Sequence, residues 1–294
     1  MVESTSGGGM STGSPPGRRR RPERATSGGK AVVIGVLVGV LVLVAIAAGV
    51  LMTRGGDTPT TTTPIPTTVD VLLVEGQRRT EYAAVVQQKT GILAAAYLSA
   101  TNASTVGQQM AGTKVPTSLE GFLFPATYPV DPKKPVSDLV DYQLRVYGQQ
   151  TARVNYAYAK KRNLTKYDVL ILASIIEREA SNPKDRRLIA GVFYNRLKLG
   201  MRLDADPTVS YALGSWTKEL TKSALGINSP YNTRRFPGLP PGPICNPGFD
   251  SIDAAANPTR TKNLYFVASP SGKVFYSLND AAHQQAIARA KANG

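Results

Sequence analysis

The sequence predicts an α+β protein whose folded part follows a single N-terminal transmembrane helix. Residues 31–52 form one uncharged apolar run, which is long enough to cross a bilayer as a helix. Beyond residue 69, stretches with the apolar periodicity of helices alternate with short β-prone stretches. A mixed helical and β domain is therefore expected after the membrane anchor.

The flanks of the apolar run predict its orientation. Residues 1–30 are rich in Gly, Ser, Pro and Arg, as in disordered tails, and carry six basic and two acidic side chains. Because basic flanks stay in the cytoplasm, we expect a single-pass plasma-membrane protein with a cytoplasmic N-terminus and an extracytoplasmic folded part. The run is longer than the core of a signal peptide, which favours an uncleaved anchor. Residues 53–68 are rich in Thr and Pro and predict an extended linker.

Composition narrows the classes of partner. The formal net charge of +15 favours anionic partners such as nucleic acid, phospholipid headgroups or anionic cell-wall polymers. Aromatic residues are sparse and no basic helix carries interleaved aromatics, so nucleic acid is not expected. Cys245 is the single cysteine and His283 the single histidine, a composition from which we expect neither a metal site nor a cofactor.

The first folded stretch predicts a small unit of one strand and two helices. Residues 69–76 read as a strand that turns at its glycine, residues 80–88 and 92–98 read as helices, and the unit is expected to end near Pro116. Residues 119–130 are aromatic and β-prone, and a long helix is predicted over residues 136–161.

A helix with two glutamates at its end follows. Thr165 and Asp168 fit a capping box that begins it. At 100° per residue Glu179 lies on the apolar stripe of this helix, whereas Glu177 lies about 160° away. Burial raises the pKa of a carboxyl group and lets it hold a proton near neutral pH. Glu179 is therefore a candidate general acid, with a buried salt bridge to Arg196 as an equally weighted alternative, and Glu177 is expected to be a solvated helix-end charge.

The rest of the chain predicts helices joined by long loops and one hairpin. An amphipathic helix is expected over residues 186–199, and Asp206 then precedes a short helix, where an N-cap role is favoured over catalysis. The loops at 229–233 and 238–244 contain Tyr, Asn, Gly and Pro, as loops that line binding clefts often do. A buried hairpin is expected from residues 263–268 and 274–277, followed by a helix from Ala281.

Several of these segments occur in the order of one known family. They are L-E-G-F-L-F-P-A-T-Y, L-A-S-I-I-E-R-E-A, G-V-F-Y-N-R-L, G-M-R-L-D-A-D-P-T-V-S-Y-A-L-G, S-P-Y-N-T, G-L-P-P-G-P-I, N-P-G and N-L-Y-F-V-A, spread from about Leu119 to His283. The chain resembles the YceG-like family of endolytic murein (lytic) transglycosylases, known as MltG. Members of that family have a cytoplasmic N-terminus, one membrane span and an extracytoplasmic catalytic part.

The resemblance implies a LysM-like module over residues 69–117 and a lytic transglycosylase catalytic domain over residues 118–294. It implies a general acid/base in the E-x-E pair, which we place at Glu179, since Glu179-Ala-Ser-Asn-Pro is similar to the signature around the catalytic glutamate of other lytic transglycosylases. Roles in binding glycan or supporting the catalyst are implied for Glu177, Tyr194, Asn195, Arg196, Asp206, Thr208, Tyr231, Asn232 and Asn246.

The reaction that the resemblance implies is non-hydrolytic cleavage of the MurNAc-β-1,4-GlcNAc bond of nascent peptidoglycan strands, which leaves 1,6-anhydro-MurNAc ends. Expected partners are glycan strands, the plasma membrane and the peptidoglycan synthases of elongation or division. Two alternatives stay open: a hydrolase that uses Cys245 and His283, and a non-catalytic wall-binding or scaffold protein of the cell-envelope synthesis machinery.

Overall fold

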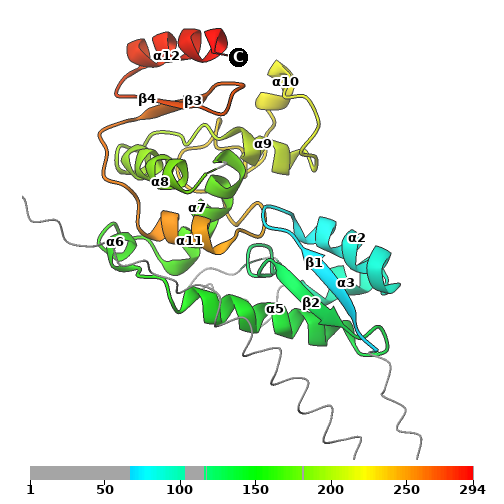
Figure 1. The fold of residues 1–294 in the computed structure, drawn as a ribbon. Helices are drawn as coiled ribbons and strands as arrows, with labels where there is room; N and C mark the ends of the chain where they lie inside the picture. The colour runs from blue at the N-terminus through cyan, green and yellow to red at the C-terminus, as the bar shows by residue number, and fades with distance from the viewer. Residues whose placement is uncertain (1–66, 103–115, 117, 181, 294) are drawn as a thin grey trace, which may run out of the picture. The chain divides into compact units, whose positions relative to one another are not determined.

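The computed structural model describes residues 67–102, 116, 118–180 and 182–293, all within one unit of the chain (Figure 1). The expected basic tail, the expected transmembrane helix and all but the last two residues of the expected linker lie outside these residues. Within the described ranges, no helix has the length and apolar character needed to cross a membrane. The described elements are helices and two short antiparallel strand pairs, in agreement with the α+β class.

The first strand, β1 (Val69–Leu73), is followed by α2 (Arg79–Thr90) and α3 (Ala94–Ala100), as predicted. Its partner is β2 (Ala126–Val130), which runs antiparallel so that Val69 lies opposite Val130. The strand–helix–helix unit is thus completed by a strand that lies beyond its expected end near Pro116. The inward side chains of this pair, Val71, Leu73 and Tyr128, are buried in the core.

The single long helix expected over residues 136–161 is wrong. The structure has α5 (Val136–Thr151) and a separate short helix, α6 (Ala157–Lys160). Asn155 lies between them, and its side-chain Oδ1 accepts a hydrogen bond from the Ala157 amide at 2.9 Å. A side-chain acceptor of this kind favours the start of a new helix over the continuation of α5. The spacing of apolar residues, on which the prediction rested, does not reveal such a break.

The centre of the fold is α7 (Lys166–Glu179), and every residue of this helix from Tyr167 to Ile176 is buried. The predicted capping box is confirmed, because Thr165 Oγ1 accepts from the Asp168 amide and Asp168 Oδ2 accepts from the Thr165 amide. Next come α8 (Pro183–Lys198) and, later in the chain, α11 (Phe249–Ala256), which packs against both α7 and α8. This packing fixes the C-terminal end of α7, where the two glutamates lie.

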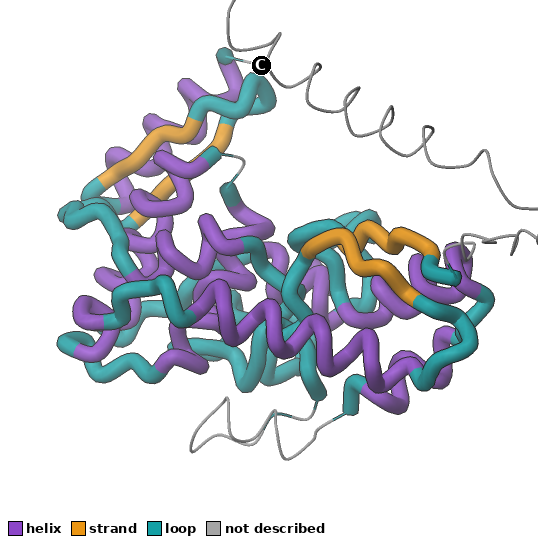
Figure 2. Tube along the Cα trace, turned by 60° about the horizontal axis from the view of Figure 1, so that its bottom comes forward, coloured by secondary structure: helices purple, strands orange, loops and turns teal. Residues whose placement is uncertain are grey.

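Two short helices, α9 (Asp206–Ala212) and α10 (Lys222–Leu225), lie in the long connection after α8. The predicted hairpin is confirmed as β3 (Tyr265–Ala268) and β4 (Val274–Ser277), and α12 (Asp280–Ala292) packs along it. The strand expected to be buried is instead partly exposed over Tyr265–Val267, because only a two-stranded ribbon forms. Figure 2 shows the two strand pairs on either side of the central helices.

Gly191 marks a close crossing of chain segments. It lies in the middle of α8, and a Cβ there would collide with the Thr259 carbonyl oxygen and lie 2.9 Å from Thr261 Cγ2. We expect Gly191→Ala to lower the free energy of unfolding by about 2 kcal/mol, because the crossing backbone must shift. Gly148→Ala in α5 is the control, since a Cβ there meets nothing within 4 Å. Gly148→Ala should raise the free energy of unfolding by about 0.5–1 kcal/mol. Denaturant unfolding measures the effect of each substitution, and equal effects would contradict the close approach at Gly191.

Candidate active site

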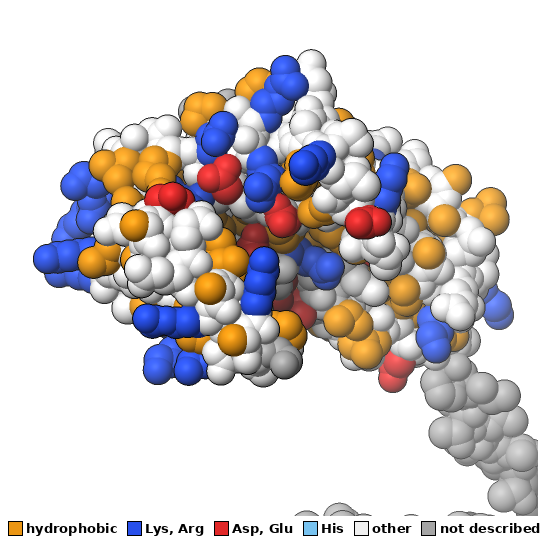
Figure 3. Space-filling view, turned by 90° about the horizontal axis from the view of Figure 1, so that it is seen from above, with side chains coloured by type: hydrophobic (Ala, Val, Ile, Leu, Met, Phe, Trp, Pro, Cys, Tyr) orange, Lys and Arg blue, Asp and Glu red, His pale blue; other side chains and the backbone are white. Residues whose placement is uncertain are grey.

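Glu179 is the last residue of α7 and lines a cavity of about 440 Å³. The helix ends there because Ala180 turns to an extended conformation and Asn182 caps the start of α8, its Oδ1 accepting from the Asp185 amide. Side chains of α8, α9, β3 and α12 complete the wall of the cavity. Figure 3 shows one face of the molecule hollowed at its centre, with acidic and basic side chains gathered around the hollow.

The surroundings of Glu179 favour its protonated form. Burial, reinforced by the nearby Asp206 carboxylate, raises the pKa of Glu179 to about 8, and the smaller effect of the Arg196 guanidinium opposes this rise. Among the described residues, no cation lies within salt-bridge distance of the Glu179 carboxylate. Glu179 can therefore carry a proton at neutral pH and present it to the cavity, which is what a general acid must do.

The predicted alternative, a salt bridge from Arg196 to Glu179, is absent from the structure. Arg196 Nη1 instead lies 3.1 Å from Asp204 Oδ2 and donates to the Leu203 carbonyl at 2.9 Å, while its Nε donates to the Leu264 carbonyl. The guanidinium also lies over the ring of Tyr265, 5.0 Å from its centroid. These contacts hold Arg196 in the cavity wall as a fixed positive charge.

Asp206 was expected to cap its helix, and that expectation is wrong. Ala205 occupies the N-cap position, and Asp206 is the first helical residue. Its Oδ1 accepts from Arg234 Nη1 at 2.7 Å, and both side chains line the cavity beside Glu179. An arginine 28 residues away thus turns the carboxylate toward the cavity, where its charge helps to keep Glu179 protonated.

Glu177 is not the solvated charge that the sequence predicted. Its side chain is 5% exposed, its Oε1 lies 3.2 Å from Arg186 Nη2, and its Oε2 accepts from the Gly248 amide at 3.0 Å. The helical wheel correctly separates the two glutamates, but the face that carries Glu177 is covered by the start of α11. Glu177 therefore ties α7 to α8 and α11, away from the cavity of Glu179.

Two predicted residues of α8 face other parts of the protein. Tyr194 is buried, its hydroxyl donates to the Ala255 carbonyl at 2.9 Å, and its ring lines a different cavity. Asn195 donates from Nδ2 to the carbonyls of Thr261 and Asn263, each at 2.9 Å. Both side chains fasten chain segments that pass α8, and Asn195 fixes the approach to β3.

Four further predicted residues also lie outside the Glu179 cavity. Thr208 and Asn232 are fully buried; Thr208 Oγ1 donates to the Ala205 carbonyl, and Asn232 Nδ2 donates to the carbonyls of Leu225 and Ile227. These bonds shape the loops that present Asp206 and Arg234. Asn246 is fully buried and its Oδ1 accepts from the Gly121 and Leu123 amides. The ring of Tyr231 packs on Tyr211 with centroids 4.8 Å apart.

The structure adds cavity residues that the motif argument missed, chiefly His283, Tyr265 and Arg234. The ring of His283 stacks on Tyr265 with centroids 5.0 Å apart, and its Nδ1 is buried with no hydrogen-bond partner among the described residues. Burial, with a smaller contribution from Arg196, lowers the pKa of His283. A neutral imidazole in the cavity wall can hydrogen-bond a substrate hydroxyl or amide. His283 lies on α12, so its place in the cavity wall depends on how that helix packs and not on a local sequence pattern.

Glu120 is a second carboxyl with a raised pKa. It lies in the stretch before β2, where burial raises its pKa to about 8, opposed by hydrogen bonding from the Arg79 amide. Its Oε1 accepts from that amide at 2.9 Å and from Asn246 Nδ2 at 3.0 Å. Glu120 lines a smaller cavity of about 250 Å³, separate from that of Glu179. Glu120 belongs to the segment L-E-G-F-L-F-P-A-T-Y, but no local sequence pattern predicts that its side chain is buried.

The structure argues against Cys245 as the nucleophile of a hydrolase. Cys245 is fully buried, and its Sγ lies 3.3 Å from the Ser174 carbonyl on α7. Burial raises the pKa of the Cys245 thiol well above its usual value. A reactive thiolate needs the opposite surroundings, namely access to substrate and a lowered pKa.

Comparison with known proteins shows to which family the chain belongs. The model of the YceG-like family matches residues 52–289. The chain belongs to the YceG-like family. This YceG-like protein is 40% identical over 186 residues to the endolytic murein transglycosylase of Bacillus subtilis, a match that covers 62% of the chain and 51% of that relative. It is 38% identical over 176 residues to the endolytic murein transglycosylase of Streptococcus pneumoniae, covering 58% of the chain and 32% of that relative.

A crystal structure of a yceG-like protein from Listeria monocytogenes has the same fold. It superposes with a TM-score of 0.66 at 32% sequence identity, over 74% of this chain and 75% of the other. The match spans about half of the length of the Bacillus subtilis relative and about a third of that of the Streptococcus pneumoniae relative. The recognised family and the α+β class are therefore confirmed.

Proposed function

We propose that this chain is a membrane-anchored endolytic lytic transglycosylase that cleaves the MurNAc-β-1,4-GlcNAc bond of nascent glycan strands. The observation that carries the proposal is the Glu179 carboxyl, whose raised pKa and position in a polar cavity suit a proton donor. The names of the relatives support the same reaction class. By cutting within a strand, the enzyme would end glycan elongation.

In the proposed mechanism Glu179 acts twice. It first protonates the oxygen that bridges the two sugars, so that the bond breaks as the leaving hydroxyl forms. The resulting carboxylate then accepts the proton of the muramyl C6 hydroxyl, whose oxygen closes on C1 to give the 1,6-anhydro ring. The nucleophile belongs to the substrate and is already in place. A second catalytic carboxylate, which ordinary glycosidases need, is not required.

The remaining cavity residues would orient the glycan. Arg196 and Arg234 supply fixed donors, Asp206 supplies an acceptor and keeps Glu179 protonated, and His283 supplies a neutral imidazole. Among the other predicted residues, Asn195, Thr208 and Asn232 would act by holding the loops around the cavity. Tyr194, Tyr231, Asn246 and Glu177 would support the site from outside it.

The setting of the enzyme is proposed from the sequence. Residues 31–52 would anchor it in the plasma membrane, with residues 1–30 in the cytoplasm and the folded part outside. The unit that begins at residue 69 would serve as a LysM-like module, a role supported by its strand, two helices and closing strand. Peptidoglycan synthases, which make the nascent strands, would be the protein partners.

Product analysis tests the proposed reaction. Full-length protein is incubated with purified glycan strands, and the fragments are separated and weighed by mass spectrometry. New 1,6-anhydro-muramyl ends support the transglycosylase. Fragments with reducing muramyl ends would identify a hydrolase, and binding to strands without cleavage would favour the scaffold alternative.

We expect activity to fall above about pH 8. The first step needs protonated Glu179, and its pKa of about 8 means that the protonated fraction is lost as the pH rises through that value. Asp206→Asn removes a neighbouring negative charge that raises this pKa, so the basic limb should move to lower pH. The measurement is kcat/KM against pH for both proteins, and a limb that stays in place would contradict the assignment.

A further inference from the structure

A second cavity, lined by residues from other elements, lies apart from Glu179. It has a volume of about 570 Å³ and is formed where the turn between α6 and α7 meets the last turns of α8 and the loop at residue 239. Its lining combines basic, amide and aliphatic side chains and comprises Lys161, Arg162, Asn163, Leu164, Tyr194, Leu197, Lys198 and Leu239. No carboxylate is among them.

The charges at this cavity are not neutralised by the protein. Arg162, Lys161 and Lys198 are exposed, and none has an acidic partner within salt-bridge distance among the described residues. Arg162 is held over the ring of Tyr158, with its guanidinium carbon 5.3 Å from the centroid. Uncompensated cations around a concave surface favour an anionic ligand.

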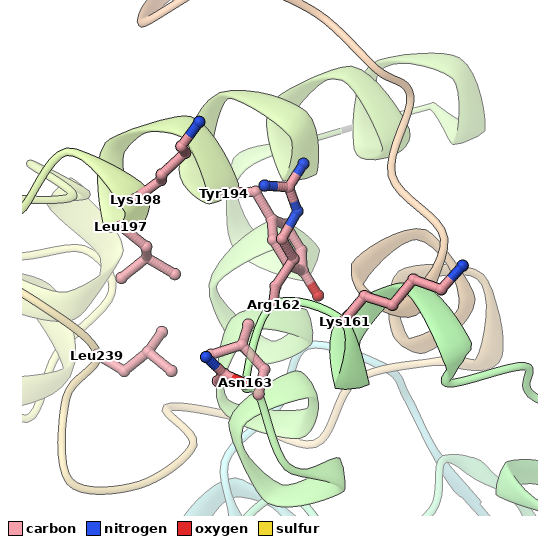
Figure 4. A pocket seen from close by; sticks show the side chains of 8 residues that line it. Lys161, Arg162, Asn163, Tyr194, Leu197, Lys198 and Leu239 are labelled. Carbon is pink, nitrogen blue, oxygen red and sulfur yellow. The ribbon is translucent and has the colours of Figure 1, made fainter.

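The inner wall is apolar. Leu164, Leu197 and Leu239 are half-buried. Figure 4 shows Leu197 and Leu239 on one side of the cavity, with Arg162, Asn163 and Tyr194 across from them. Lys198 rises at the rim, while Lys161 extends away from the leucines. A ligand that fits must join carboxylates or phosphates to small aliphatic groups.

The position of this cavity relative to Glu179 limits the ligands that it could bind. Arg196 faces the Glu179 cavity, and Tyr194 and Lys198 lie about 160° around α8 from it. The two cavities therefore flank one helix, whose diameter with side chains is about 10–12 Å. A four-residue extended peptide spans about 13 Å, a length comparable to this diameter.

We propose that this cavity binds the acidic peptide stem of the glycan strand, with stem carboxylates at Arg162 and Lys198 and alanine methyl groups against the leucines. The inference rests on the proposed function, because it takes peptidoglycan as the substrate. It makes the stem a recognition element that lies outside the reacting sugars.

The test compares two substrates and two double variants of the full-length protein. Arg162→Gln/Lys198→Gln removes two charges at the cavity, and Lys133→Gln/Lys134→Gln removes two exposed charges beside β2. On stem-bearing strands the first variant should raise KM about tenfold with little change in kcat, since two charge-assisted contacts are lost. On strands stripped of stems both variants should match the wild type. An equal change on both substrates, or none, overturns the proposal.

A binding measurement separates this proposal from the proposed reaction. The catalytically silenced Glu179→Gln protein is titrated with an acetylated alanine–glutamate–lysine–alanine peptide and with the same peptide carrying neutral amides in place of its carboxylates. Binding of the acidic form alone, weakened about tenfold by Arg162→Gln/Lys198→Gln, supports the cavity. Equal binding of both peptides contradicts it. If the wild type released no anhydro products, the proposed cleavage reaction would be contradicted, but the peptide-binding result would not be affected.

Discussion

Glu179→Gln is expected to reduce the release of 1,6-anhydro products by about 10²–10⁴-fold, the usual contribution of a general acid or base. Glutamine keeps the shape of the side chain but can neither donate the proton to the bridging oxygen nor accept one from the muramyl C6 hydroxyl. The loss should fall on kcat, because the sugar contacts of the cavity wall remain. Steady-state kinetics on defined glycan strands measure it.

The fold of this variant should be intact. The pKa of Glu179 is raised on folding, so the stability that its proton gives is complete below the ordinary glutamate pKa and is lost as the pH rises through about 8. Glutamine avoids this loss, and Glu179→Gln should unfold at a temperature no lower than the wild type at pH 8. Glu219→Gln, an exposed loop substitution, is the control for activity. Wild-type turnover in Glu179→Gln would refute the assignment.

Glu177→Ala is expected to act on stability instead. It removes one partner of a nearly buried ion pair, since the side chains of Arg186 and Glu177 are 11% and 5% exposed. Breaking such a pair costs about 3–5 kcal/mol, and the neighbouring Glu75 and Asp250 carboxylates, which also approach Arg186, should reduce this to about 2–3 kcal/mol. The melting temperature should fall by about 5–10 °C, while activity per folded molecule stays within about tenfold of the wild type.

Glu75→Ala is the matched control for that substitution. Glu75 approaches the same Arg186 nitrogen, but at 3.8 Å and with a side chain that is 49% exposed. Exposed pairs of this kind contribute about 0–1 kcal/mol, so its melting temperature should barely change. If Glu177→Ala instead abolished activity with an unchanged melting temperature, Glu177 would become the catalytic candidate.

What the sequence predicts well is local. The capping box that starts α7 joins residues three apart, and the helical wheel that separates Glu177 from Glu179 needs only the regular turn of the same helix. The hairpin of β3 and β4 is likewise set by adjacent segments and the turn between them. Each of these features is stabilised by neighbours in the chain, so the pattern contains the information.

What the sequence misses depends on distant partners. The Glu177 carboxylate is buried by Gly248, 71 residues away, and Asp206 is turned to the cavity by Arg234. His283 lines the cavity only because α12 packs along the hairpin. A periodic pattern gives the face of a helix but not which element covers it, and that covering decides whether a carboxylate is solvated, paired or left protonated.

The central claim is that Glu179 drives cleavage without water. Digestion of glycan strands in water enriched in heavy oxygen tests it directly, with mass spectrometry of the new muramyl ends. The account predicts ends that lack one water relative to hydrolysed ends and contain no heavy oxygen. Muramyl ends that carry one heavy oxygen would show that water is the nucleophile and would contradict the account.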